Sequence, residues 1–433
     1  MRLRPRADWW IARTCLKVLI VAQNASTRFG GEAILPVHYY RILRSRGFHV
    51  RMIAHDRNKD DLQEHLGPWM DHVELVPDTA YHKAIWRAGQ PFPRGIREPL
   101  FGTALNFVNE MYQRRIIRKL IDGGEVDIIH QPIPVSPKAP SSIHGFGVPV
   151  VIGPMNGAMT YPDGYEDYQT VLERRFIAFG RAAAGIANRA IPGKRRATTL
   201  LVANERTRTG LPASPAHVEE LVENGVVLST WDVPSGRQAS TGFRLAFMGR
   251  LVNWKAVDVT LQAVKLAQHH IPDLHLDILG DGPERNALEQ LARVLGIADN
   301  VTFHGFQPQD ACASILANSD AFILNSLFEC GGAVLLEAMS MGIPVIASDW
   351  GGPADYIDPS CGILLDPSPR SSFPQRLAEA VQTLQENPEK ARAMGAAGAT
   401  KVREHFDWER KLDRVIDIYD EAISRFQEGR QKL

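Results

Sequence analysis

Short apolar runs alternate with amphipathic segments along most of the chain. Residues 16–22 form an apolar run that indicates a buried strand, and residues 32–46 carry apolar side chains at helical spacing. A second strand follows and ends near Ala54, so this stretch predicts a βαβ unit. The apolar runs at 126–130 and 148–153 predict further strands of the same parallel sheet.

The same pattern returns after Phe243 and continues to a last strand at 343–348. Strands that alternate with helices predict a parallel sheet that is covered by helices on both faces. The expected strands are 244–250, 274–280, 301–305, 321–326 and 343–348, and the expected helices are 257–268, 283–296 and 333–341.

A segment rich in Ser, Gly, Pro and Thr, residues 229–242, separates the two patterns and is the best candidate for a linker. The sequence therefore predicts an α/β protein with two Rossmann-like, doubly wound domains. In open parallel sheets, ligands bind beyond the carboxyl ends of the strands, so we expect the functional residues there. The expected parts are an N-terminal extension at 1–15, a first domain at 16–235, a second domain at 240–405 and a C-terminal amphipathic helix at 406–433.

Length and composition agree with two globular domains. The chain has 433 residues, of which 44% are hydrophobic and 23% are charged. It contains no run of about 18 apolar residues, so we expect no transmembrane helix. Arg13 and Lys17 interrupt the apolar start, which argues against a signal peptide. Four cysteines without a CxxC pair disfavour a disulfide scaffold and a structural zinc site, and we expect a cytoplasmic protein.

The charge is zero overall but is unevenly distributed. Residues 1–210 contain 30 Lys and Arg against 19 Asp and Glu, and the rest of the chain has the opposite excess. Residues 171–210 are especially basic, which suits an anionic membrane surface or a nucleic acid. A solvated surface without a partner is the alternative. Because no RNA-binding signature is present, we expect no nucleic-acid partner.

Two cations follow the expected strand at 244–250. Arg250 lies at its end, and Lys255 lies at the start of the next helix. Permanent cations beside a helix N-terminus form an anion site, and a diphosphate would suit it. Two solvated loop cations are the alternative.

Two acids follow the expected strand at 321–326. Glu329 lies in the loop, and Glu337 lies about one turn inside the next helix. Gly331 and Gly332, between them, let a ligand approach the backbone and the free amides that open the helix. The carboxylates can accept hydrogen bonds from two sets of vicinal hydroxyls. The alternatives are a plain loop acid and a favourable charge near a helix N-terminus.

The first domain offers weaker candidates. Gly30 and Gly31 close the first loop and open a helix whose amides could meet a phosphate, although a plain turn is almost as plausible. His130 ends a strand and either binds a substrate hydroxyl or is satisfied within the core. Asn156 belongs to a turn with an expected exposed amide. The sequence contains no DxD, HExxH, HxH, P-loop or Gly-x-Ser-x-Gly pattern, so we expect no metal site.

Together, Arg250, Lys255, Glu329, Gly332 and Glu337, with the run LEAMSMGIPVIAS, strongly resemble the retaining glycosyltransferases of family 4, which have the GT-B fold. The similarity is best over roughly 243–410 and includes the LGDGPER turn and the FDWE entry to the last helix. It implies two domains that face a central cleft and a C-terminal helix that crosses back to the N-terminal domain. The chain departs from the family where Cys330 and Gly331 replace the frequent Gly-Phe after the first acid.

The resemblance also implies roles for these residues. Arg250 and Lys255 would bind the donor diphosphate, Glu329 the donor sugar and Glu337 the ribose. The backbone around Phe306 would meet the base. His130 and Asn156 would lie in the acceptor or sugar region. The remaining donor-binding positions would be Gly31, Gly249, Gly331, Gly332 and Ala333.

The expected reaction moves a sugar from a nucleotide-diphosphate donor to a glycan or lipid-linked glycan, with retention and without a metal or other cofactor. It would belong to the biosynthesis of a surface polysaccharide or a glycolipid. The basic first domain would dock on an anionic membrane, at its inner face. An epimerase or phosphorylase of the same fold, or a non-catalytic nucleotide-sugar-binding partner, remains the alternative.

Overall fold

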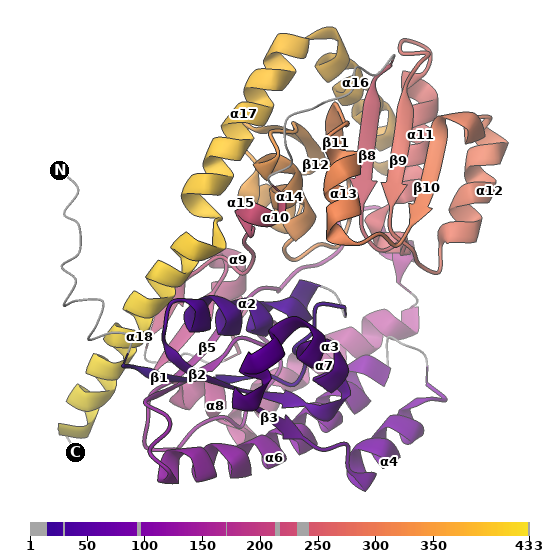
Figure 1. Ribbon diagram of the computed structural model, residues 1–433. Coiled ribbons are helices and arrows are strands. Elements are labelled where there is room, and N and C mark those ends of the chain that lie inside the picture. The colour runs from indigo at the N-terminus through magenta and orange to yellow at the C-terminus, as the bar shows by residue number, and fades with distance from the viewer. Residues whose placement is uncertain are drawn as a thin grey trace, which may run out of the picture. The chain divides into compact units, whose positions relative to one another are not determined.

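The structure is a computed structural model that describes residues 15–28, 31–92, 97–169, 171–212, 217–231 and 242–431. The chain forms two compact units, each with a parallel sheet and flanking helices (Figure 1). The predicted α/β class is therefore confirmed. The first unit contains Met1–Ala158, Thr170–Glu223 and Leu412–Leu433, and the second contains Met159–Gln169 and Asn224–Lys411.

These units differ from the expected boundaries, which assigned 159–169 and 224–235 to the first domain. For 159–169 a side-chain contact accounts for the difference, because Tyr161 stacks on Phe328 of the second unit with the ring centroids 5.2 Å apart. Most of the predicted extension at 1–15 lies outside the described residues. The predicted linker at 229–242 starts inside helix α10 (Leu228–Trp231), and its residues 232–241 also lie outside them.

The described sheet of the first unit has seven parallel strands in the order β3-β2-β1-β4-β5-β6-β7. Val18 on β1 pairs with Val50 on β2 and with Ile128 on β4, which fixes the register at the centre. Strands β4, β5 and β6 are buried along their whole length, as expected for a sheet covered on both faces. The strands are β1 (Lys17–Val21), β2 (His49–His55), β3 (Val73–Val76), β4 (Ile128–Gln131), β5 (Val150–Met155), β6 (Thr199–Val202) and β7 (Val218–Glu220).

The described sheet of the second unit has six parallel strands in the order β10-β9-β8-β11-β12-β13. Phe322 on β11 pairs with Ala246 on β8 and with Val345 on β12. The five strands and three helices predicted for this half are all present, with ends shifted by a few residues. The strands are β8 (Arg244–Met248), β9 (His275–Leu279), β10 (Val301–Gly305), β11 (Ala321–Leu324), β12 (Val345–Ser348) and β13 (Gly362–Leu365).

Helices cover the sheets in both units (Figure 1). In the first unit they are α2 (Gly31–Ser45), α3 (Lys59–Leu66), α4 (Ala80–Gly89), α6 (Thr103–Asp122), α7 (Val171–Ala190), α8 (Gly193–Arg196) and α9 (Glu205–Thr209). In the second unit, after α10, they are α11 (Val257–Ala267), α12 (Arg285–Leu295), α13 (Gln309–Leu316), α14 (Ala333–Ser340), α15 (Gly352–Tyr356), α16 (Phe373–Glu386) and α17 (Pro388–His405). None of the described helices combines the length and the apolar character that crossing a bilayer requires.

The last helix, α18 (Trp408–Gln431), belongs to both units. It starts in the second unit, and its residues from Leu412 onward belong to the first, which confirms the predicted crossover. Within the first unit, the Tyr419 hydroxyl lies 2.7 Å from Nδ1 of His130 on β4, and both residues are fully buried. Arg425 donates to Thr199 on β6 at 3.0 Å. These bonds hold the helix against the first sheet between its central strand β4 and strand β6.

We expect Tyr419→Phe to destabilise the first unit by about 1–3 kcal/mol, because Nδ1 of His130 would lose its buried partner. Urea denaturation should show a lower midpoint for this variant. Tyr81→Phe is the matched control, since Tyr81 is 69% exposed. Equal midpoints for the two variants would contradict this role of Tyr419.

Candidate active site

The candidate residues of the second unit gather where its sheet reverses strand order. Strands β8 and β11 are neighbours, but the chain continues from β8 to β9 on one side and from β11 to β12 on the other. Open α/β sheets bind ligands at such switch points, beyond the carboxyl ends of the strands. Lys255 follows β8 and Glu329 follows β11, so both lie at this switch point.

Lys255 and Glu329 form an ion pair there, in which Nζ of the lysine donates to Oε2 of the glutamate. Lys255 ends the short 3₁₀ turn η5 (Asn253–Lys255). The two side chains are only 14% and 17% exposed. Partial burial strengthens the attraction relative to a surface pair, and the remaining exposure leaves the pair accessible to a polar ligand. The structure therefore brings together the residues expected to bind the diphosphate and the sugar.

A buried asparagine fixes the backbone next to Lys255. Ala256 has a φ of 51°, which is uncommon for a residue other than glycine. Asn325, fully buried after β11, donates to the Ala256 carbonyl at 2.9 Å and accepts a hydrogen bond from the Thr260 hydroxyl at 2.6 Å. Asn325 thus couples the loop that carries Lys255 to the strand that leads to Glu329.

Two glycines that sequence analysis overlooked support the Glu329 loop. The Gly352 amide donates to the Glu329 carbonyl at 2.7 Å. A Cβ on Gly352 would lie 2.3 Å from the Cys330 carbonyl oxygen, and a Cβ on Gly351 would lie 2.5 Å from the Glu329 carbonyl oxygen. Only glycine allows backbones to approach this closely. The available signal was the pair Gly351-Gly352, which two residues separate from the strand expected at 343–348.

Gly332 turns this loop into α14 with a φ of 80°, in the left-handed region that favours glycine. The helix begins at Ala333, so its first amides are free to donate beside the Glu329 loop. Glu337 is partly exposed, yet burial of its carboxyl raises the pKa to about 7. Near neutral pH this carboxyl can therefore either accept or donate a hydrogen bond.

Arg250 and Phe306 are exposed at the same sheet edge. Arg250 comes directly after Gly249 at the end of β8, and Phe306 comes directly after β10 and is 79% exposed. The Gly249 amide donates to the Leu279 carbonyl at 2.9 Å, which anchors the start of the loop on β9. An exposed cation and an exposed aromatic ring are thus both available to a ligand.

In the first unit, Gly31 is exposed and begins α2, whereas Gly30 lies outside the described residues. The loop before them is held by Asp61 of α3, which accepts hydrogen bonds from the Thr27 amide and hydroxyl at 2.8 Å each and from the Ser26 hydroxyl. Burial opposes ionisation of Asp61, but these bonds outweigh it and lower the pKa. Sequence analysis did not single out Asp61.

The other two candidates of the first unit are engaged inside it. Nε2 of His130 donates to the Gly153 carbonyl at 2.7 Å while Nδ1 bonds Tyr419, which favours the satisfied core histidine over a substrate ligand. Asn156 is 2% exposed and accepts from Asn204 at 3.3 Å. The expected exposed amide of Asn156 was therefore wrong, because Asn204 and Thr207, at the start of helix α9, pack against it.

The fold also gathers three potential metal ligands that no sequence motif indicated. His55 ends β2, Asp78 follows β3, and His82 lies in the first turn of α4. Their ligand atoms all lie within 4.8 Å of one another. Burial lowers the pKa of both His55, to about 4, and His82, so both imidazoles are neutral at pH 7. The positions come from separate elements, which is why spacing alone did not reveal them.

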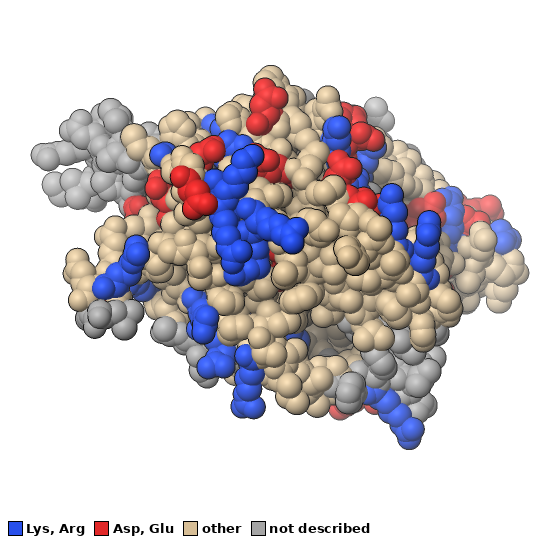
Figure 2. All heavy atoms as spheres, turned by 90° about the horizontal axis from the view of Figure 1, so that it is seen from below, with Lys and Arg blue, Asp and Glu red and all other residues tan. Residues whose placement is uncertain are grey.

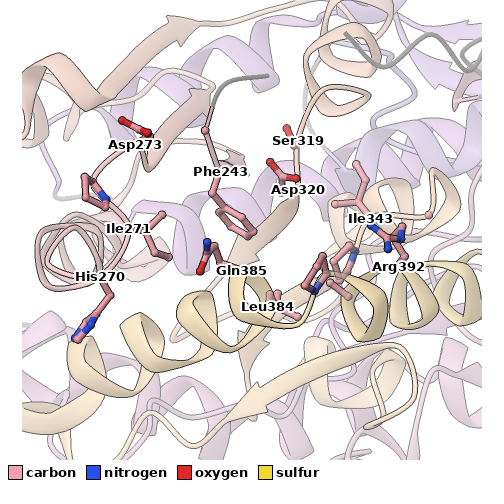
Figure 3. A pocket seen from close by; sticks show the side chains of 16 residues that line it. Phe243, His270, Ile271, Asp273, Ser319, Asp320, Ile343, Leu384, Gln385 and Arg392 are labelled. Carbon is pink, nitrogen blue, oxygen red and sulfur yellow. The ribbon is translucent and has the colours of Figure 1, made fainter. Parts of the chain in front are cut away.

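A cavity of about 480 Å³ lies elsewhere in the second unit (Figure 3). Phe243, Asp320 and Pro344 line it, and they directly precede β8, β11 and β12. The cavity is therefore at the amino ends of the strands, opposite the edge where Lys255 and Glu329 meet. It does not belong to the candidate site.

Most of the second unit matches a known protein family. Residues 233–401 match the family described as Glycosyl transferases group 1, which includes every candidate of the second unit. The D-inositol 3-phosphate glycosyltransferase of Salinispora tropica is 31% identical over 52% of this chain and 51% of that protein. The lipopolysaccharide core biosynthesis glycosyltransferase LpsD of Rhizobium meliloti is 32% identical over 42% of this chain and 51% of that protein. The chain thus spans about half the length of the curated relatives it matches.

Solved structures extend the likeness to nearly the whole chain at the level of the fold. Anabaena HepE in complex with UDP superposes with a TM-score of 0.67 and 17% identity, over 94% of this chain and all of that one. A glycosyltransferase from Rickettsia africae gives a TM-score of 0.65 and 14% identity, over 94% and 98%. The chain therefore has the two-domain GT-B fold, and its residues 233–401 match the family described as Glycosyl transferases group 1.

Proposed function

We propose that this protein is a retaining glycosyltransferase that moves a sugar from a nucleotide-diphosphate donor to a hydroxyl of a glycan or a lipid-linked glycan. The observation that carries the proposal is the Lys255–Glu329 pair at the switch point of the second sheet, inside the matched family region. A cation and a carboxylate in contact are the two groups that a phosphorylated sugar requires. The relatives named above are glycosyltransferases, and HepE was solved with UDP.

The ion pair suggests how the donor is accommodated. The donor diphosphate competes for Lys255, and exposed Arg250 adds a second charge that stabilises the leaving group. Once Lys255 pairs with phosphate, Glu329 is released to accept hydrogen bonds from the sugar hydroxyls. The free amides of Gly332 and Ala333 meet the phosphate oxygens, Phe306 contacts the base, and Glu337 binds the ribose.

The transfer takes place on one face of the sugar. The departing phosphate oxygen accepts the proton of the attacking acceptor hydroxyl, and the new glycosidic bond forms on the face that the leaving group vacates. This course retains the anomeric configuration and needs no pair of catalytic carboxylates. It needs no divalent ion either, because Arg250, Lys255 and the helix amides offset the diphosphate charge.

We further propose that the first unit binds the acceptor and docks on an anionic membrane surface, at the inner face of the membrane. We expect it to bind no nucleic acid. Arg174, Arg175, Arg189, Arg195 and Arg196 of the basic segment are exposed, whereas Lys194 is buried. On the face shown in Figure 2, Lys and Arg side chains are widespread, and Asp and Glu lie mainly along its upper part. Exposed cations of this kind attract anionic lipid through a screened, long-range field.

Substitution of the pair should abolish transfer. We expect Lys255→Ala and Glu329→Gln each to lower kcat at least 10²-fold, because each removes a group that acts on the reacting diphosphate or sugar. Turnover of a panel of UDP-, GDP- and ADP-sugars measures this effect, and NMR of the product reports the anomeric configuration. Lys265→Ala, on α11, is the control. Unchanged turnover in both variants, or an inverted product, would overturn the proposal.

The raised pKa of Glu337 predicts a pH-dependent stability. Between about pH 4.5 and pH 7 the folded protein keeps a proton that the unfolded chain releases, so this group makes stability fall as the pH rises through that window. Glu337→Gln removes this loss of stability, which is at most roughly 3.5 kcal/mol at about 1.4 kcal/mol per pKa unit. The variant should therefore gain Tm relative to wild type from pH 5 to pH 8. Glu428→Gln, at an exposed position, should show no such gain.

Liposome flotation tests the membrane proposal. We expect recovery with vesicles that contain anionic lipid, falling with added salt, and little recovery with neutral vesicles. The double variant Arg195→Ser and Arg196→Ser should float less than a control with two exposed cations changed in the second unit, Lys390→Ser and Arg392→Ser. Equal recovery with both lipid compositions would argue against membrane docking.

A further inference from the structure

The carboxyl edge of the first sheet gathers two imidazoles and a carboxylate from three separate elements. His55 ends β2, Asp78 lies between β3 and α4, and His82 lies in the first turn of α4. One ligand atom from each residue lies within 4.8 Å of the others. The two imidazole rings meet edge to face, with centroids 5.0 Å apart. No other group of three or more potential ligands occurs in the described part of the chain.

His82 carries the strongest sign of a missing ligand. The residue is 4% exposed, and its Nε2 is buried without a hydrogen-bond partner. The other ring nitrogen, Nδ1, lies 2.8 Å from the Thr79 hydroxyl and accepts a long hydrogen bond of 3.3 Å from the Thr79 amide. Coordination through Nε2 moves the ring proton to Nδ1, which then gives up the amide bond and donates to that hydroxyl. Buried polar atoms are almost always satisfied, so Nε2 requires an explanation.

The other two residues complete the set. His55 is 3% exposed, and its Nδ1 accepts a long hydrogen bond of 3.2 Å from the Arg57 amide. Coordination through Nε2 of His55 moves the ring proton to Nδ1 and breaks that bond. The side chain of Asp78 is 45% exposed, and its nearest cation, Lys83, is 3.9 Å away. Asp78 is therefore free to turn and gives an ion a route from solvent.

We propose that His55, Asp78 and His82 form a binding site for a divalent transition metal of the zinc type. Imidazole nitrogen and carboxylate oxygen are ligands that Zn²⁺ prefers, and three protein ligands leave a fourth position for water. Ligand atoms around tetrahedral zinc are about 3.3 Å apart, from bond lengths of about 2.0–2.1 Å. The ligand atoms, now within 4.8 Å of one another, would therefore have to move closer together, and the exposed Asp78 side chain can contribute to this movement.

A bound ion would cross-link the end of β2 to the start of α4. It would thereby fix the loop between β3 and α4 at the carboxyl edge of the first sheet. This site is separate from the Lys255–Glu329 pair, which lies in the second unit. The inference therefore does not depend on the proposed glycosyl transfer.

Metal titration of the full, tag-free chain tests the site. We expect one Zn²⁺ per chain to compete with a chromophoric chelator, and Co²⁺ at the same site to give the intense visible bands of a tetrahedral complex. His82→Gln and Asp78→Asn should each weaken binding at least tenfold and remove the Co²⁺ bands. His270→Gln, which changes another histidine far along the chain, should leave both unchanged. Zn²⁺ should also raise the Tm of the wild type but not of Asp78→Asn.

The proposal fails if wild type shows no saturable Zn²⁺ binding, or if binding survives both His82→Gln and Asp78→Asn. Asp78→Asn keeps the test decisive when the buried histidine variant does not fold, since Asp78 is exposed. Loss of binding in His270→Gln alone would place the metal elsewhere and would also overturn it.

Discussion

The contact between Lys255 and Glu329 is the interaction on which the candidate site depends. A lysine and a glutamate that are both about five-sixths buried would be costly apart, because neither could regain its hydration. Together they satisfy each other, and a polar ligand can exchange with either partner. The pair thus keeps two reactive charges at the sheet edge without destabilising the fold. The switch between β8 and β11 makes the contact possible, because it brings together loops that are 74 residues apart.

The surrounding backbone is arranged to hold this contact. Asn325 ties the Lys255 side to the strand that leads to Glu329, and it stabilises the uncommon conformation of Ala256. On the other side, Gly351 and Gly352 let the chain after β12 pack directly against the Glu329 loop. Both act by removing conformational freedom, so that the charged groups are positioned before a donor arrives.

The sequence predicted the strands and helices of the second unit better than the backbone contacts that hold its candidate site. Strong apolar runs defined β8 to β12, and the cations and acids that follow them indicated the candidate site, because chemistry at a strand end can be read from residue type alone. Strands β3, β6, β7 and β13 were missed, since each has at most four residues, and β7 also includes Glu219 and Glu220. Asn325, Asp61 and the Gly351-Gly352 pair were missed for another reason. Their roles depend on contacts between distant segments, which spacing does not encode.

The two units show why position at a strand end is necessary but not sufficient for function. His130 and Asn156 lie at strand ends of the first sheet. Lys255 and Glu329 lie in the corresponding position in the second sheet, after β8 and β11. His130, however, bonds a backbone carbonyl and a buried tyrosine, partners that a ligand cannot displace without opening the core. The side chains of Lys255 and Glu329 bond each other at a solvent-accessible edge, where a ligand can replace either one. The unsatisfied Nε2 of His82 is the third case, a buried group whose partner the protein itself does not supply. Whether a polar group can bind a ligand therefore depends on which partners it already has and whether a ligand can replace them. Its position along the strand does not decide this.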